Sequence, residues 1–294
     1  MISELEENKP STIQHDTVVD LLRITMLVYN YGKNIVVEDE NQTVETFVGK
    51  MREAGTLETM KVSDARKEAL SEIAEHAPSG KVHKFISEPT TDLQVGITTN
   101  DDDKRICVVF RGSESKSDWY YDLQIRKRHI RDGIYVHGGF YDQLYGNDVC
   151  KKLIDEMKQL VEANPDYQIY ITGHSLGAAL STLFGFLLSH EVDNAITVVS
   201  FASPRVGNME WRKAFEAKSN LTHYRIANNR DVVTAFPMYK YKHVGENIRL
   251  FEDTFAVFSN YSYNTWYDYS LFRCWSISDH DCDLYYKRLL KNKW

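Results

Sequence analysis

The feature that most constrains the fold is the pentapeptide Gly-His-Ser-Leu-Gly at residues 173–177, which matches the pattern Gly-X-Ser-X-Gly. A β-type run, 167–172, leads into it, and small and apolar residues, 178–184, lead out. This order predicts a strand, a sharp turn and a helix, with Ser175 at the turn. Glycine is needed two positions before and after the serine, because side chains there would collide with a neighbouring strand or helix.

Short apolar segments alternate with helical segments from Leu93 onwards. The expected strands are 93–98, 105–110, 167–172, 195–201 and 222–226. The expected helices between them are 140–163, 177–190 and 208–218. Strands that alternate with helices predict an α/β protein with a mostly parallel sheet, covered by helices on both faces.

The residues before Leu93 have a different pattern. Residues 16–30 carry apolar side chains at helical spacing, and residues 43–77 are helix-prone and charged. We therefore expect an N-terminal helical layer over residues 1–90, packed on a single domain that comprises residues 1–294.

Composition excludes some classes of protein. The net charge of −7 gives no general attraction to nucleic acid. No run approaches the roughly 18 to 20 apolar residues of a transmembrane segment. The first ten residues are polar and acidic, without the apolar run of a signal peptide, which predicts a cytoplasmic protein. The four cysteines lack zinc-binding spacing and are interpreted as reduced thiols.

A serine hydroxyl is a weak nucleophile at neutral pH, so it requires a base and a carboxylate that orients the base. In a hydrolase with this architecture the chain order is Ser, Asp or Glu, then His. Asp231 follows the strand 222–226 and is the candidate acid, with a turn or capping aspartate as the alternative.

Three histidines with room for an acid before them follow Ser175: His223, His243 and His280. His280 is the preferred base; neighbouring acids would favour its protonated form if they lie close to the ring. A surface or capping histidine is the alternative for His280. His243 lies on a strand-like stretch and is interpreted as structural, although it stays open as a base.

Ester hydrolysis also requires donors for the negative charge that develops on the carbonyl oxygen. The amide of Leu176, the residue after the serine, is one candidate. The second is Ser113, which follows the strand 105–110 and offers an amide and a hydroxyl. This chemistry requires no metal and no cofactor.

Several motifs together resemble those of the class 3 lipases, the family of filamentous-fungal triacylglycerol lipases, some feruloyl esterases and plant phospholipases A1. The matching segments are 110–113, 118–123, 136–140, 173–177, 201–207, 229–233, 236–237, 243–245 and 278–280. The resemblance implies an α/β-hydrolase fold, with a mostly parallel central sheet flanked by helices. It also implies Ser175 as nucleophile, Asp231 as acid and His280 as base, with Ser113 and Leu176 as oxyanion donors and His243 non-catalytic.

The segment after Ser113 corresponds to the lid of interfacially active members of this family. The candidate lid residues are Glu114, Lys116, Asp118, Trp119, Tyr120 and Tyr121. Residues 114–118 are strongly polar and have little apolar area to bury in an oil surface. This predicts weak interfacial activation and a preference for dispersed or short-chain esters. The alternative is that the aromatic residues 119–121 alone form the apolar face of a working lid.

Two further segments carry weaker signals. The basic run 126–131 is interpreted as a solvated strand or loop, with contact to phospholipid head groups as the alternative. The aromatic-rich segment 261–272 is interpreted as a packed loop, with an acyl or aromatic-ester pocket as the alternative.

The sequence thus predicts a carboxylic ester hydrolase, with an acyl ester or lipid as substrate and transient contact with a lipid surface. Acylglycerols are the preferred substrate class. A phospholipase A1 and an aromatic-acid esterase are the alternatives within catalysis. A catalytically silent interaction scaffold is the alternative of another class.

Overall fold

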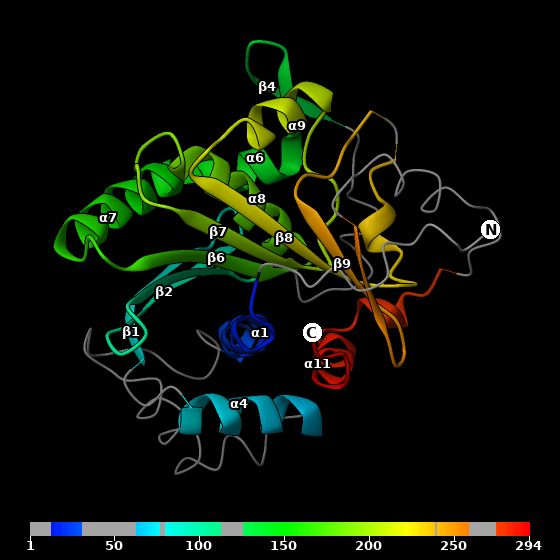
Figure 1. Cartoon of the computed structure of the whole chain (residues 1–294). Coiled ribbons are helices and arrows are strands. Elements are labelled where there is room, and N and C mark those ends of the chain that lie inside the picture. Colours follow the sequence, from blue (N-terminus) through cyan, green and yellow to red (C-terminus); the bar gives the residue numbers. More distant parts are fainter. Residues whose placement is uncertain (1–12, 31–62, 77–79, 113–125, 239, 259–274) are drawn as a thin grey trace.

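The computed structural model describes residues 13–30, 63–76, 80–112, 126–238, 240–258 and 275–294. Within them lies an eight-stranded sheet with the order β1-β2-β3-β6-β7-β8-β9-β10 (Figure 1). The strands are β1 Gly80–Glu88, β2 Leu93–Asn100, β3 Arg105–Phe110, β6 Gln168–His174, β7 Ile196–Phe201, β8 Leu221–Asn228, β9 Glu246–Leu250 and β10 Phe255–Phe258.

The centre of this sheet is parallel and its margins are antiparallel. Strands β3, β6, β7, β8 and β9 pair in parallel, whereas β1, β2 and β10 join antiparallel. All six residues of β3 are buried, as expected for a strand covered on both faces. Phe110 pairs with Gly173 and His174 with Phe201, so the carboxyl ends of three central strands meet at one edge. The predicted α/β fold is confirmed.

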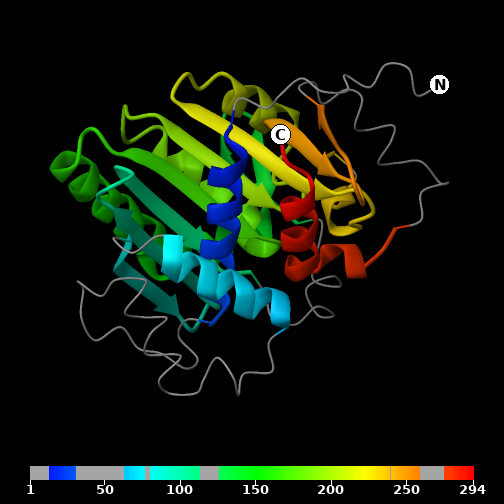
Figure 2. The ribbon, with the colours of Figure 1, turned by 60° about the horizontal axis from the view of Figure 1, so that its bottom comes forward.

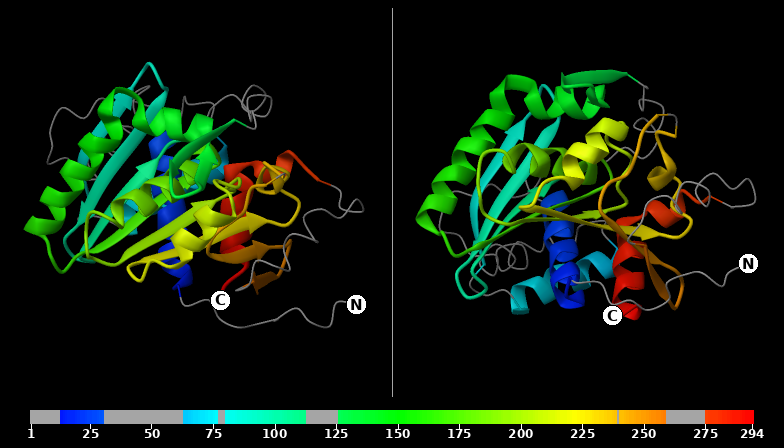
Figure 3. Two further views of the ribbon diagram at one scale, coloured as in Figure 1. Left: turned by 90° about the horizontal axis from the view of Figure 1, so that it is seen from above. Right: turned by 45° about the horizontal axis from the view of Figure 1, so that its top comes forward.

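Helices cover both faces of the sheet. One layer contains α6 Gly138–Tyr145, α7 Val149–Ala163, α8 Leu176–Leu188 and α9 Met209–Glu216. The other contains α1 His15–Asn30, α4 Asp64–His76 and α11 Cys282–Lys291 (Figure 2). The layers lie on opposite sides in the right-hand view of Figure 3, and each closes its own apolar core against the sheet. Among the described residues, no helix is both long and apolar enough to cross a membrane.

Two sequence expectations need correction. Residues 80–88, assigned to the helical layer, form the edge strand β1 instead. The single helix expected over 140–163 is two helices, α6 and α7, separated by the 3-10 turn Gly146–Asp148. Asn147 and Asp148 have φ values of 49° and 59°, which an α-helix cannot continue through. The description of the whole chain as a single domain stays a prediction.

Two further features complete the described part of the chain. Strands β4 Lys127–Arg131 and β5 Ile134–His137 form a separate antiparallel pair. Short 3-10 turns occur at η2 Val233–Ala235 and η3 Ser278–His280. The turn η2 follows Asp231, after β8 ends, and the turn η3 contains His280.

Candidate active site

Ser175 occupies the turn between β6 and α8. Its φ of 60° and ψ of −121° place a non-glycine residue in a sparsely populated conformation. Its N–H donates to the carbonyl of Phe201 on β7 at 3.0 Å, which ties the strained turn to the neighbouring strand. The side chain therefore lies at the carboxyl edge of the parallel strands, where functional groups of such sheets gather.

The two glycines of the motif are required by close backbone contacts. A Cβ on Gly173 would lie 2.5 Å from the carbonyl carbon of Gly177 and 2.8 Å from the carbonyl oxygen of Phe110. A Cβ on Gly177 would lie 2.2 Å from that same Phe110 oxygen. The start of α8 thus packs against the ends of β3 and β6 with no room for a side chain, as the motif predicted.

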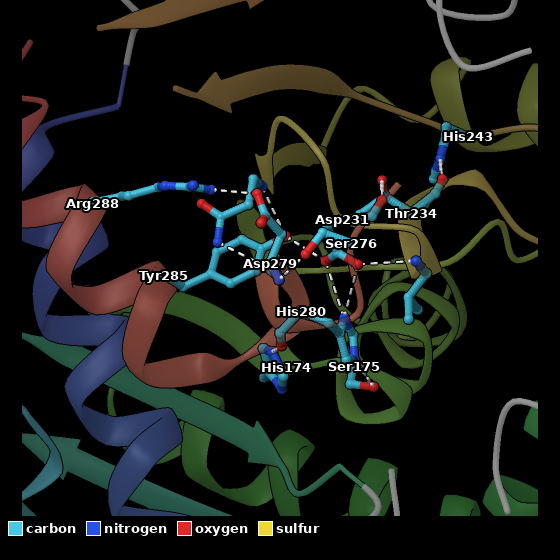
Figure 4. A network of polar contacts seen from close by, with 12 residues as sticks. His174, Ser175, Asp231, Thr234, His243, Ser276, Asp279, His280, Tyr285 and Arg288 are labelled. Carbon is cyan, nitrogen blue, oxygen red and sulfur yellow. Dashed lines mark hydrogen bonds and ion pairs between the residues drawn. The ribbon is translucent and has the colours of Figure 1, made fainter. Parts of the chain in front are cut away.

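The structure brings Ser175, Asp231 and His280 together (Figure 4). Ser175 Oγ lies 2.7 Å from His280 Nε2. His280 Nδ1 lies 3.0 Å and 3.1 Å from the two carboxylate oxygens of Asp231. An ionised carboxylate only accepts, so Nδ1 carries the proton and Nε2 is free to accept from the serine hydroxyl.

Asp231 is fixed by its own turn as well as by His280. Its side chain is buried, and Oδ1 accepts the N–H of Val233 at 2.9 Å. This is a turn-capping contact, the alternative interpretation of Asp231. One carboxylate makes both contacts, so the two interpretations are compatible.

Tyr285 is a partner of Asp231 that the sequence did not reveal. Its hydroxyl donates to Asp231 Oδ2 at 2.7 Å and accepts the N–H of Asn228 at 2.8 Å. Burial, followed by the negative charge of Asp231, raises the pKa of Tyr285 well above its usual range. The hydroxyl therefore stays protonated and remains a donor to Asp231.

His174 was not identified from the sequence either. Its Nε2 contacts the carbonyl of His280 at 3.0 Å, and its Nδ1 contacts the hydroxyl of Tyr29 on α1 at 3.1 Å. Nε2–H must donate to the carbonyl, so Nδ1 accepts from Tyr29. A Cβ on Gly112 would lie 2.2 Å from the Tyr29 hydroxyl oxygen. The N-terminal helix thus lies against the loop after β3 and reaches the segment of His280 through His174.

The acids next to His280 in sequence are engaged by other partners. Asp279 Oδ2 accepts from Arg288 Nη1 at 2.7 Å. Asp281 caps α11 by accepting the N–H of Asp283 at 3.0 Å. Among the described residues, the carboxylate that hydrogen-bonds the His280 imidazole is that of Asp231. Asp231 lies 49 residues before His280 in the sequence.

His243 supports the turn of Asp231. Its Nε2 donates to the Thr234 carbonyl at 2.7 Å, and the Thr234 hydroxyl donates to the Asp231 carbonyl at 2.8 Å. Burial, then the charges of Arg225 and Arg205, lower the pKa of His243 well below its usual range. It remains a neutral, buried histidine that contacts the loop of the acid, in agreement with its structural interpretation.

His223, the remaining candidate base, is also buried. Its Nε2 contacts the hydroxyl of Ser200 at 2.8 Å on the neighbouring strand. Burial and the charge of Arg225 lower its pKa well below the usual range. His280 is therefore the histidine of the three that contacts Ser175.

Leu176 is the first residue of α8, so its N–H has no intrahelical acceptor. Ser113 and the candidate lid residues Glu114, Lys116, Asp118, Trp119, Tyr120 and Tyr121 lie outside the described residues, as does the aromatic segment 261–272. Within the described ranges, no group of three His, Cys, Asp or Glu could hold a metal ion.

The basic run forms strand β4. Arg128 pairs with Asp142 on α6 at 2.8 Å, and the ammonium of Lys127 lies 5.0 Å from the ring centroid of Tyr241. Arg126 and Arg131 are exposed. The run is thus a half-exposed strand, as its plainer interpretation expected.

A parallel sheet that presents a serine on a strained turn, joined to a histidine and a buried aspartate, defines an α/β-hydrolase. The family model for class 3 lipases matches residues 107–241. The resemblance inferred from the motifs is thereby confirmed over this part of the chain.

Individual relatives agree with this family. The chain is 30% identical over 168 residues to a secreted mono- and diacylglycerol lipase A of Penicillium cyclopium, covering 55% of this chain and 53% of the relative. It is 30% identical over 184 residues to phospholipase A1-II 3 of Oryza sativa subsp. indica, covering 52% and 44%. The chain thus spans about half the length of these relatives.

The triacylglyceride lipase of Rhizomucor miehei has the same fold. Its crystal structure superposes with a TM-score of 0.70 at 20% identity, covering 92% of this chain and 94% of that one.

The predicted cytoplasmic location is contradicted by the relatives. The Penicillium relative is a secreted lipase. That prediction depended only on the first residues of the chain and is wrong.

Proposed function

We propose that the protein is a carboxylic ester hydrolase that acts on acylglycerols through an acyl-enzyme on Ser175. The observation that carries this proposal is the contact of 2.7 Å between Ser175 Oγ and His280 Nε2, with Asp231 on the opposite ring nitrogen. The class 3 lipase match and the lipase relatives support acylglycerols as the substrate class.

In this mechanism His280 Nε2 takes the proton of Ser175 as Oγ attacks the ester carbonyl carbon. Asp231 stabilises the imidazolium that forms, and the amide of Leu176 donates to the developing oxyanion. His280 then protonates the leaving alcohol, and the acyl group stays on Ser175. In the second half His280 takes a proton from water, which attacks the acyl-enzyme, and then returns a proton to Ser175 Oγ as the fatty acid is released.

A fluorophosphonate probe tests the nucleophile without assuming a substrate. We expect the probe to label wild-type protein and to leave Ser175→Ala unlabelled. Ser181→Ala, which removes a buried hydroxyl six residues further along α8, is the matched control and should label normally. Absence of labelling in the folded wild type would favour the silent scaffold.

A substrate panel then separates the ester classes. We expect hydrolysis of p-nitrophenyl esters and short triglycerides, and little activity on feruloyl esters. The polar segment 114–118 supports weak interfacial activation. A jump in rate as a short triglyceride passes its solubility limit would contradict that part of the proposal.

A second candidate is phospholipase A1 activity. The exposed cations of Arg126 and Arg131 favour it, because they follow the lid segment and suit anionic head groups. The rice phospholipase relative supports the same alternative. Release of the sn-1 fatty acid from phosphatidylglycerol vesicles tests it, with Arg126→Gln/Arg131→Gln expected to lower the rate. Lys151→Gln/Lys158→Gln on α7 is the control. Equal rates in both variants would exclude a role for Arg126 and Arg131.

A further inference from the structure

The segment that carries His280 has little regular backbone structure of its own. η3 consists of the three residues Ser278–His280, and the N–H of His280 donates to the Ile277 carbonyl at 3.1 Å. A 3-10 turn of this length does not fix its position relative to the sheet. A backbone hydrogen bond from the Ser276 N–H to the Arg230 carbonyl, at 2.8 Å, ties the start of the segment to the loop of Asp231. Side-chain contacts from other elements hold the residues that follow, up to His280.

Asp279, the residue before His280, is held at three points. Its carboxylate accepts from Arg288 Nη1 on α11 at 2.7 Å. Its carbonyl accepts from the side-chain amide of Asn228, at the end of β8, at 2.8 Å. Its N–H donates to Ser276 Oγ at 3.2 Å. These contacts join the base segment to a central strand and to the C-terminal helix (Figure 4).

The ion pair between Asp279 and Arg288 is nearly removed from solvent. The side chains are 7% and 11% exposed, whereas the second acid near Arg288, Glu252, is 67% exposed and lies at 3.4 Å. A buried ion pair adds little net stability compared with apolar side chains, because desolvation offsets the attraction. The pair does fix the relative orientation of the two side chains, since guanidinium and carboxylate interact through hydrogen bonds with defined geometry.

We propose that the Asp279–Arg288 ion pair positions His280 for proton transfer with Ser175. Both members are positioning residues, because neither contacts the serine. The same helix supplies Tyr285 to Asp231, so α11 orients two members of the triad at once. This proposal deepens the proposed hydrolase function and rests on it.

The test combines single and double variants. Arg288→Met and Asp279→Asn should each lower the first-order rate of fluorophosphonate labelling, and kcat on p-nitrophenyl butyrate, by about 10-fold to 100-fold, with KM little changed. The double variant should be no less active than the less active of the two single variants, because the two groups act as a pair. Arg288→Lys keeps the charge and should retain an intermediate rate.

Arg212→Met is the matched control. It breaks the ion pair with Glu216 on α9, at 2.8 Å, which has no contact with the triad. All variants are assayed at a temperature at which circular dichroism shows them folded. A wild-type labelling rate in Arg288→Met and Asp279→Asn, combined with lower thermal stability, would mean a purely structural pair and would overturn the proposal.

A measurement that needs no substrate separates the positioning role of the ion pair from the proposed hydrolase function. The downfield proton resonance of His280 Nδ1–H, identified by its absence in His280→Gln, reports the contact with Asp231. We expect Arg288→Met and Asp279→Asn to shift or broaden it and Arg212→Met to leave it unchanged. An unlabelled wild type with a sensitive resonance would reject the hydrolase function alone, and an insensitive resonance would reject the positioning role.

Discussion

Ser175 and His280, the proposed nucleophile and base, are held in place by different kinds of contact. Ser175 is fixed by backbone: a strand before it, a helix after it, and a hydrogen bond from its N–H to β7. The segment before His280 has a backbone hydrogen bond to the Asp231 loop, from Ser276 to Arg230, but side chains contact the histidine itself: His174 on its carbonyl and Asp231 on its ring. A short motif can therefore specify the position of Ser175, whereas the position of His280 depends on residues spread over the chain.

The largest expected effects come from removing either of these two groups. Ser175→Ala and His280→Ala should each lower kcat on a p-nitrophenyl ester by a factor on the order of 10⁶, if chemistry limits the rate. His243→Gln should retain turnover, because His243 contacts the acid loop and not Ser175. Loss of activity in His243→Gln together with an active His280→Ala would reverse the assignment of the base.

Gly177→Ala tests the backbone side of the comparison. The added Cβ would lie 2.2 Å from the Phe110 carbonyl oxygen, and a strand backbone cannot move away as a flexible side chain can. We expect a loss of about 3 kcal/mol in the free energy of unfolding by urea. Gly139→Ala is the control: its nearest contact is a side-chain atom of His137 at 3.3 Å. Equal stability of both variants would contradict the close packing of the serine turn.

Tyr285→Phe tests the side-chain contacts that hold Asp231 next to His280. It removes the donor to Asp231 and leaves the buried N–H of Asn228 without its acceptor. We expect about 1 to 3 kcal/mol lower stability and a kcat about 10-fold lower, with KM unchanged. Tyr286→Phe is the control, since its hydroxyl contacts Arg23 instead. An unchanged kcat in Tyr285→Phe would show that Asp231 does not need this donor.

The smallest expected effect is a pH dependence of stability from His243. Burial lowers its folded-state pKa well below the value of about 6.5 expected when unfolded. Below that pH the unfolded chain takes up a proton that the folded protein excludes, so stability is lost as the pH falls. The slope for this group is at most about 1.4 kcal/mol per pH unit. Urea unfolding between pH 7 and 5 should show a shallower slope in His243→Gln than in His129→Gln, an exposed control.

The sequence by itself determined the mostly parallel sheet and the serine turn. Both follow from local patterns: apolar runs that alternate with helical segments, and two glycines that the close approach of Phe110 requires. The family resemblance followed from motifs in a constant order. Asp231 and His280 could be selected by chain order and by their place after a strand, although the residues alone left His243 open.

Only the tertiary structure decided which side chains support this site. Tyr285 lies 54 residues from Asp231 in sequence, and Tyr29 lies 145 residues from His174. Asp279 turned out to bind Arg288 and not the imidazole beside it. No local period encodes such contacts, because they depend on how separate helices pack on the sheet. The sequence specified the turn of Ser175 through backbone geometry, and the fold specified the surroundings of His280 through packing.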